Sequence, residues 1–279
     1  MKNQHSSFVW STARDLMRTF ALFFVLVTTL AAGPPKGKLV WKADFENGDC
    51  FPEISNFGRD VAETVNGQAS SHVDITWQRA VVHSGTYAER EHTTRDPDLL
   101  GKYASHRGYC FQSWISTNGR AVPTPIVVTA WIYLEKFDSE DWLSFITLIS
   151  ALTEGYPAGS ILTLDMTPSM ELTVWCQPKH QQGTAFVIQP SGPAAARMPL
   201  KRWVKLQVYA DWNGPDGAIK VWKDDDLVID APKRDIGPAS ALEKGHFGLY
   251  AGPNLNEITM YNDDLSVETV SRLPPTARN

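Results

Sequence analysis

The sequence predicts an all-β protein, a sandwich of two antiparallel sheets that follows an N-terminal signal or anchor segment. Between residues 38 and 270 the apolar runs are short, and apolar side chains alternate with polar ones at every second position. Glycine, proline, asparagine and aspartate separate these runs, and no apolar period of 3.6 residues extends over more than three turns. The 10 Trp, 18 Pro and 19 Gly residues fit the same class.

Residues 1–33 are predicted to be a signal peptide or a membrane anchor. Lys2, Arg14 and Arg18 precede an uncharged apolar run at 19–32, and small residues follow it. This run is short for a membrane span, which needs about 20 residues, so cleavage and export are favoured. We therefore expect a secreted, periplasmic or cell-surface protein, held at a membrane only if the segment stays uncleaved. Residues 34–37 are a flexible lead-in, 38–270 one domain, and 271–279 a polar tail.

Charge and cysteines exclude some functions. The net charge is −5, and the lysines and arginines are scattered, so no basic face for a nucleic-acid partner is expected. Export permits a disulfide among Cys50, Cys110 and Cys176. Cys176 lies on the apolar side of a predicted strand, which leaves Cys50 with Cys110 as the more plausible pair, and the pairing stays open. The spacing fits no zinc motif.

Seven strands are predicted from alternation. In chain order they cover residues 126–134, 160–166, 170–177, 203–212, 218–222, 227–230 and 245–251. In the clearest of them, 203–212, aliphatic side chains point to one side and Lys205, Gln207 and Tyr209 to the other. Turn residues at 167–169, 213–217 and 224–226 join neighbouring strands, which predicts antiparallel hairpins.

The second face of several strands carries rings and amides instead of small polar groups. The candidate ligand-binding residues on these faces are Trp131, Tyr133, Trp175, Gln177, Gln207 and Tyr209. Aromatic rings on a solvated face are unfavourable unless something covers them, and sugars suit such a face because their C–H planes stack on the rings. A polysaccharide on one shared face is therefore expected. The alternative is that the long segments 51–78 and 177–201 cover these rings.

Acidic residues near both ends of the chain suggest a cation site. The segments 42–48 and 260–267 resemble the ends of carbohydrate-binding modules and related sandwich domains, in which the first and last strands are neighbours. Convergent carboxylates would repel without a cation, and Ca²⁺ takes six to eight oxygen ligands. Glu46 and Asp264, supported by Asp263 or Asp44, are thus candidate ligands of a structural Ca²⁺ ion. The alternative is that they cap turns or are solvated.

The middle and end of the chain resemble polysaccharide lyases of the heparin-lyase-I and alginate-lyase type. The segments that carry the resemblance are 84–90, 128–134, 203–206, 216–222 and 246–250. The last of these is similar to the strand "Y-F-K-A-G-x-Y", in which the final Tyr works at the active site, and Tyr250 matches that position. The resemblance implies a concanavalin A-like jelly roll. Its candidate catalytic residues in this chain are Tyr250, His246, Tyr209 and Arg90.

Three functions follow from these observations. The first is an exported carbohydrate-binding domain that needs only the aromatic face. The second is a lyase that cleaves an acidic, uronate-containing glycan by β-elimination, with His and Tyr transferring protons. The third is a structural or adhesive surface protein. The sequence has no "Q-I/V-H" tripeptide of alginate lyases, and Gly248 stands where their strand has Lys, so binding ranks ahead of cleavage.

Overall fold

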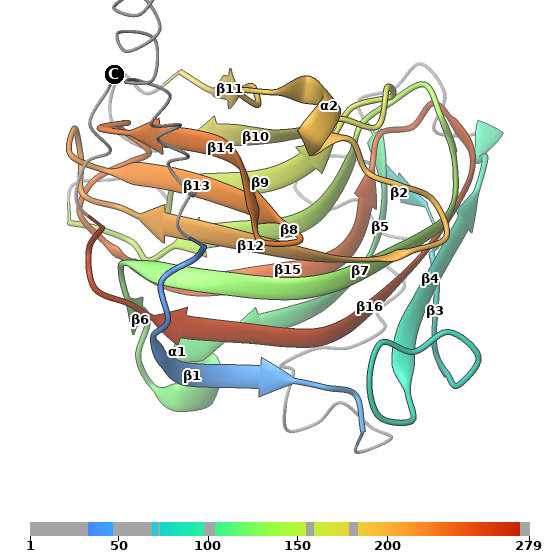
Figure 1. The fold of residues 1–279 in the computed structure, drawn as a ribbon, viewed down its shortest axis with the longest axis horizontal. Helices are drawn as coiled ribbons and strands as arrows, with labels where there is room; N and C mark the ends of the chain where they lie inside the picture. The colour runs from blue at the N-terminus through green and yellow to red at the C-terminus, as the bar shows by residue number, and fades with distance from the viewer. Residues whose placement is uncertain are drawn as a thin grey trace, which may run out of the picture. The chain divides into compact units, whose positions relative to one another are not determined.

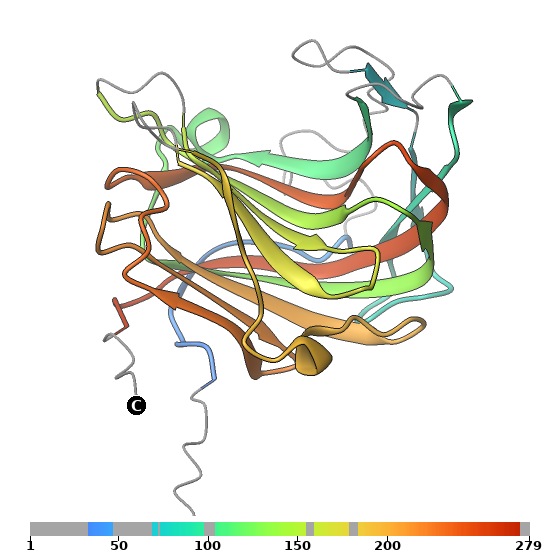
Figure 2. The ribbon, with the colours of Figure 1, turned by 90° about the horizontal axis from the view of Figure 1, so that it is seen from above.

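The fold is described from a computed structural model, which describes residues 33–46, 69–71, 73–97, 104–154, 159–178 and 184–273. These residues form two β-sheets that lie face to face as two layers (Figures 1 and 2). The predicted signal or anchor segment lies outside the described residues, except for Gly33. In the described part of the chain, no helix is long and apolar enough to cross a membrane.

Sheet A lies toward the viewer in Figure 1. Its strand order is β14-β13-β12-β7-β16-β4-β3, and β1 pairs with β16. The strands are β1 (Lys38–Ala43), β3 (Asp74–Gln78), β4 (Ala88–Thr94), β7 (Ile126–Ser139), β12 (Trp203–Asp211), β13 (Ala218–Lys223), β14 (Asp226–Pro232) and β16 (Leu255–Thr269). All described pairings in this sheet are antiparallel.

Sheet B lies behind it, in the order β11-β10-β9-β8-β15-β5-β2, and β6 pairs with β15. Its strands are β2 (Ala69–Ser71), β5 (Ala104–Ser113), β6 (Val122–Pro123), β8 (Leu143–Ser150), β9 (Ile161–Met166), β10 (Leu172–Gln177), β11 (Phe186–Ile188) and β15 (Ala241–Ala251). The short helices are α1 (Trp114–Asn118) and α2 (Pro193–Ala196). Among the described pairings of this sheet, only β2 with β5 is parallel.

The core lies between the sheets and confirms the predicted alternation. In β7, Ile126, Val128, Ala130, Ile132 and Leu134 are all fully buried, as period-2 alternation requires. The aliphatic side of β12 and the side of β10 that carries Cys176 are buried in the same way. All seven predicted strands are present, and several are longer than predicted: the strand expected at 126–134 continues to Ser139. The strand at 104–113 was not predicted.

The first and last strands are neighbours, as expected, with Lys38 opposite Thr269 and Ala43 opposite Leu265.

Cys110 and Cys176 are buried thiols and are not joined in a disulfide. Cys50 lies outside the described residues.

Candidate functional site

Two rows of side chains cross sheet B from strand to strand, on the side away from the core. Residues directly opposite each other on neighbouring strands share a face, so the register defines each row. The first row is Arg107 (β5), Tyr250 (β15), Ser144 (β8), Asp165 (β9) and Thr173 (β10). The second is Phe111, His246, Thr147, Thr163 and Trp175 on the same strands. These ten residues, with Tyr109 and Gln177, are called the outer face of sheet B.

Arg107 and Tyr250 form a fixed pair at one end of the first row. Arg107 Nη2 donates a hydrogen bond to Tyr250 Oη over 3.3 Å, and Arg107 Nε donates to Ser105 Oγ over 2.7 Å. Trp142 packs edge-on against the Tyr250 ring, with the ring centres 4.7 Å apart. Because Tyr250 Oη accepts from the guanidinium, its own hydroxyl hydrogen is directed elsewhere. The pair thus presents a cation and a proton donor side by side.

His246 lies four positions before Tyr250 on β15, in the second row of the outer face. Its ring stacks on Tyr109 with the centres 4.4 Å apart and the planes almost parallel, and Phe111 packs at 5.2 Å. Burial lowers the pKa of His246 to about 3, and the charges of Arg107 and Lys244 act in the same direction. The imidazole is therefore neutral near pH 7, and one of its ring nitrogens carries a lone pair.

The predicted site residues are divided between the two sheets. Trp175 and Gln177 lie on β10, and His246 and Tyr250 on β15, so these four share the outer face of sheet B. The other predicted residues, Arg90, Trp131, Tyr133, Gln207 and Tyr209, lie on β4, β7 and β12 of sheet A. The expectation of one shared aromatic face is therefore wrong. Alternation separates core from surface within a strand, but it does not say which sheet the strand joins.

Most of the predicted rings and amides on sheet A already have partners within the protein. His83 stacks on Trp131 with the centres 3.6 Å apart. Tyr209 is 1% exposed, and its hydroxyl accepts a hydrogen bond from the Leu273 backbone over 3.3 Å. Gln207 Nε2 donates to the Thr129 hydroxyl over 3.2 Å. Covering groups are thus present for Trp131 and Tyr209. They are His83 and the segment near Leu273, whereas much of the two long segments considered from the sequence lies outside the described residues.

Tyr133 is also part of an aromatic cluster on sheet A. Its ring lies 5.6 Å from the ring of Trp203 and 5.6 Å from that of Tyr261, which meets it edge-on. A ligand role for Tyr133, Trp131 and Gln207 stays a prediction. A ligand bound by these residues would lie on sheet A, whereas Tyr250 lies on sheet B.

The arginine beside Tyr250 is Arg107, not the predicted Arg90. Arg90 lies on β4 opposite Tyr261, in the other sheet. Sequence reasoning missed Arg107 because no strand was predicted at 104–113. The signal was present: Arg107, Tyr109 and Phe111 alternate with the small residues Gly108 and Cys110.

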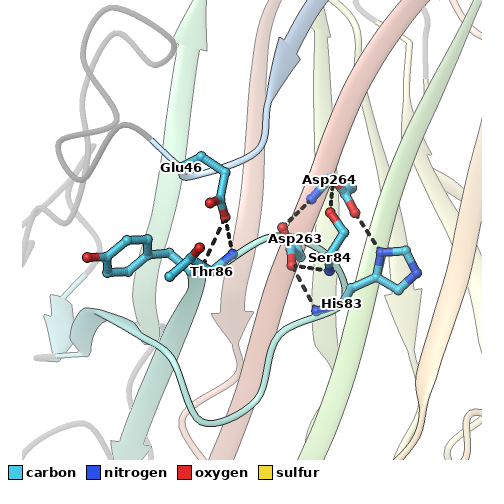
Figure 3. A network of polar contacts seen from close by, with 7 residues as sticks. Glu46, His83, Ser84, Thr86, Asp263 and Asp264 are labelled. Carbon is cyan, nitrogen blue, oxygen red and sulfur yellow. Dashed lines mark hydrogen bonds and ion pairs between the residues drawn. The ribbon is translucent and has the colours of Figure 1, made fainter.

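The carboxylates predicted to bind calcium hold the segment 83–87 in place (Figure 3). Glu46 accepts hydrogen bonds from the backbone N–H groups of Thr86 and Tyr87 at 2.8 and 2.9 Å. Asp263 accepts from the backbone of His83 and Ser84 at 2.9 and 3.2 Å. Asp264 contacts the His83 ring at 2.6 Å and accepts from the Ser84 hydroxyl at 3.0 Å. The turn-capping alternative therefore describes this arrangement.

The same geometry does not fit an ion held jointly by Glu46, Asp263 and Asp264. In the described ranges, no group of three or more His, Cys, Asp or Glu side chains is placed to hold a metal ion. Glu46 serves one part of the segment and the two aspartates another (Figure 3). Calcium binding stays a prediction from the sequence. If calcium is bound, adding a chelator such as EDTA should lower the melting temperature of the protein. An unchanged melting temperature would count against calcium binding.

Removing the Asp263 carboxylate is expected to destabilise the fold. Asp263→Ala removes the acceptor of the backbone N–H groups of His83 and Ser84, and loss of a hydrogen bond of this kind costs about 1 kcal/mol for each bond. Asp263 is fully buried, so we expect a loss of about 2 kcal/mol in the free energy of unfolding, measured by urea denaturation. Asp226→Ala is the control, since Asp226 is exposed on the surface of sheet A. Equal effects of the two substitutions would refute the anchoring role.

Two buried carboxyl groups lie between the sheets. Glu89 and Glu91 of β4 are both fully buried. Cys110 Sγ donates to Glu89 Oε2 over 2.7 Å, and Asn262 Nδ2 donates to Glu91 Oε1 over 2.8 Å. Gly248 lies against the pair, because a Cβ there would come within 1.9 Å of Glu91 Oε1. This contact explains why the position that carries Lys in the resembled strand is glycine here.

Burial favours the protonated form of both carboxyl groups. It raises the pKa of Glu89 to about 7, and it raises the pKa of Glu91 well above the ordinary value, with the charge of Glu89 adding to the effect. The folded state therefore binds protons that the unfolded chain has already released. Stability from this source is complete below the ordinary glutamate pKa and is lost as the pH rises through the raised values.

We therefore expect wild-type protein to lose more stability between about pH 6 and about pH 8 than Glu91→Gln, by up to about 1.4 kcal/mol per pH unit. Urea unfolding at the two pH values measures this. The comparison with the variant cancels the contributions of other groups, such as His246, whose lowered pKa acts in the opposite sense. Parallel pH profiles for the two proteins would show that Glu91 is not protonated in the folded state.

Solved structures of other proteins share this fold. No family model matches the sequence, and no curated protein matches it. Among solved structures, the fold is similar to the endo-β-1,4-glucuronan lyase of the fungus Trichoderma reesei, with a TM-score of 0.63 and 12% identity over 84% of this chain and 96% of that one. The described chain is a concanavalin A-like jelly roll.

Two other solved structures share this jelly roll. The cellulose induced protein Cip1 has a TM-score of 0.53 and 16% identity, over 84% of this chain and 99% of its own. The alginate lyase vAL-1 from Chlorella virus has a TM-score of 0.51 and 10% identity, over 71% of this chain and 92% of its own. Likeness at these identities establishes the fold, so the role of each site residue has to be argued from this chain.

Proposed function

We propose that this protein is a polysaccharide lyase that cleaves a uronate-containing glycan by β-elimination on the outer face of sheet B. One observation carries the proposal: the Arg107 guanidinium is fixed 3.3 Å from the Tyr250 hydroxyl, and a neutral His246 lies on the same face of the same sheet. A cation, a proton donor and a proton acceptor are the three groups that this reaction needs. All three belong to the outer face of sheet B.

The elimination transfers one proton away from the sugar and another onto the leaving group. A base removes the C5 proton of the uronate, the electron pair forms a C4=C5 double bond, and the C4–O bond breaks. An acid protonates the departing oxygen. The negative charge that develops spreads into the C6 carboxylate, and Arg107 is placed to stabilise it through charge-assisted hydrogen bonds.

His246 and Tyr250 divide the proton transfers in this proposal. His246 is neutral, so a ring nitrogen can accept the C5 proton. Arg107 is one of the charges that lower the His246 pKa. A bound carboxylate would offset that charge and make the imidazole more basic. Tyr250 Oη accepts from Arg107, which leaves its own hydrogen available for the leaving oxygen.

The remainder of the face is suited to a sugar chain. Thr147, Thr163 and Thr173 lie in the two rows and have short side chains that are only 5–6% exposed. Trp175 and Gln177 lie on β10, three strands from β15, or about 14 Å at the usual strand spacing. A ring for stacking and an amide for hydroxyl groups are thus offered along the glycan. Two of the similar structures are named a glucuronan lyase and an alginate lyase.

The second candidate function is glycan binding without cleavage. Trp175 and Gln177 support it, because they lie away from the Arg107–Tyr250 pair and need no proton transfer to bind a sugar. The two functions share one surface and differ in whether a product forms.

Incubation with glucuronan, alginate and heparin tests the proposal, with the ultraviolet absorbance of the unsaturated uronate as readout. We expect absorbance to rise with at least one of these glycans and not with cellulose, which has no carboxylate. Binding of a uronate glycan without a rise would establish the second candidate instead. Absence of both cleavage and binding would contradict a glycan function.

A further inference from the structure

Asp165 lies at the centre of the outer face of sheet B, and one of its oxygens lacks a partner. Its Oδ1 atom is buried, with no hydrogen bond to any described residue. In the neighbouring strand Ser144 lies directly opposite in the row, and the hydroxyls of Ser144 and Thr163 both act on the Asp165 carboxyl group. Buried polar atoms without partners are rare in native proteins. The unmatched Oδ1 atom, in the same row as Tyr250, indicates a place where a ligand supplies the missing hydrogen bond.

The surroundings of Asp165 contain little that would stabilise a negative charge. Ser144 of β8 and Thr173 of β10 flank it, and Thr163 is the nearest residue on the same face of its own strand. No salt bridge joins Asp165 to any residue that the structure describes. The cation in its row is Arg107, which lies beyond Ser144 and Tyr250.

This environment favours the protonated acid. Burial raises the pKa of Asp165 to about 7, and the nearby hydroxyls of Thr163 and Ser144 counter the rise only in part. Below that pH the side chain can donate a hydrogen bond, whereas above it the side chain is a buried anion. Near neutrality both forms are populated.

We propose that Asp165 is a specificity-determining residue for acidic glycans: as a carboxylic acid it donates a hydrogen bond to a uronate carboxylate, and as a carboxylate it repels it. The inference rests on the proposed function and assigns Asp165 a second uronate, next to the one at Arg107. Asp165 is two strands from Tyr250, about 10 Å at the usual strand spacing, so it contacts a neighbouring sugar and not the reacting one.

The inference has a kinetic consequence that a structural role would not produce. If only the protonated form binds the second uronate, the apparent KM follows the fraction of protein in that form. For a group with a pKa of about 7, KM rises roughly tenfold between about pH 6 and about pH 8. In Asp165→Asn this rise in KM is absent, because the amide is neutral at both pH values and can still donate.

The experiment compares KM and kcat of wild type, Asp165→Asn and Asp225→Asn for a uronate glycan at the two pH values. Asp225 is the control because it is exposed on a hairpin of sheet A. We expect Asp225→Asn to keep the wild-type rise in KM and Asp165→Asn to lose it, with little change in kcat at the lower pH. An unaltered rise in Asp165→Asn, or a flat KM in wild type, overturns the inference.

A binding measurement separates this inference from the proposed function. Calorimetric titration of the Tyr250→Phe variant with an oligouronate retains Asp165 and avoids turnover. Weaker binding at the higher pH supports the inference, and pH-independent binding overturns it even where wild type cleaves the polymer. If Asp165→Asn fails to fold in a thermal melt, Asp165→Ser replaces it in the kinetic experiment. A wild type that neither cleaves nor binds any uronate glycan overturns the function and the inference together.

Discussion

Tyr250→Phe should reduce kcat on a uronate glycan by roughly 100-fold or more, the usual contribution of a positioned proton donor. The substitution removes only the hydroxyl that Arg107 holds at 3.3 Å. It keeps the ring that packs against Trp142. The readout is the rate of formation of unsaturated uronate at saturating substrate, together with a thermal melt.

The fold is expected to survive this change. Tyr250 is partly exposed, and loss of one long hydrogen bond costs about 1 kcal/mol. Tyr87→Phe is the matched control, because Tyr87 is a partly exposed tyrosine whose hydroxyl also accepts a hydrogen bond from an arginine, Arg79. Full activity of Tyr250→Phe, or an equal loss in Tyr87→Phe, would remove Tyr250 from the reaction.

Arg107→Gln should lower kcat/KM by roughly 100- to 1000-fold, as expected when a group that stabilises developing negative charge is removed. Glutamine keeps polar atoms near Ser105 but cannot neutralise the C6 carboxylate. Arg107→Lys restores the charge without the planar fork of donors, so we expect partial recovery. The readout is again the initial rate of unsaturated product, at substrate concentrations below KM.

Arg90→Gln is the control that distinguishes the two arginines. Sequence similarity pointed to Arg90, whereas the structure places Arg107 beside Tyr250 and Arg90 on the other sheet. Near wild-type kcat/KM for Arg90→Gln, with a large loss for Arg107→Gln, follows from this placement. The reverse pattern would move the reacting centre to sheet A.

The fold was largely predictable because strand alternation is a local property. In β12 each second residue is aliphatic and buried, and the period alone identifies its core side. The neighbouring chain ends were also foreseen, and β1 does pair with β16. The sheet that each strand joins depends on long-range pairing. For this reason Trp131 and Trp175, which look alike in sequence, lie in different sheets.

The candidate site was predictable only in part, for a similar reason. His246 and Tyr250 lie on one strand, and alternation places them together on a surface. Arg107 and Asp165 reach them through register with two other strands, which the sequence does not display. The carboxylates of Glu46 and Asp263 were recognised as convergent. Their partners, the backbone N–H groups of 83–87, are present in any sequence and so leave no signature.

The central claim is that glycan chemistry takes place on the outer face of sheet B, around Arg107 and Tyr250. A crystal structure of Tyr250→Phe with a bound oligouronate tests it most directly. The account predicts a carboxylate on the Arg107 guanidinium, with the sugar chain crossing the strands toward Trp175. An ordered oligosaccharide on the Trp131 and Trp203 side of sheet A, with Arg107 uncontacted, would contradict it.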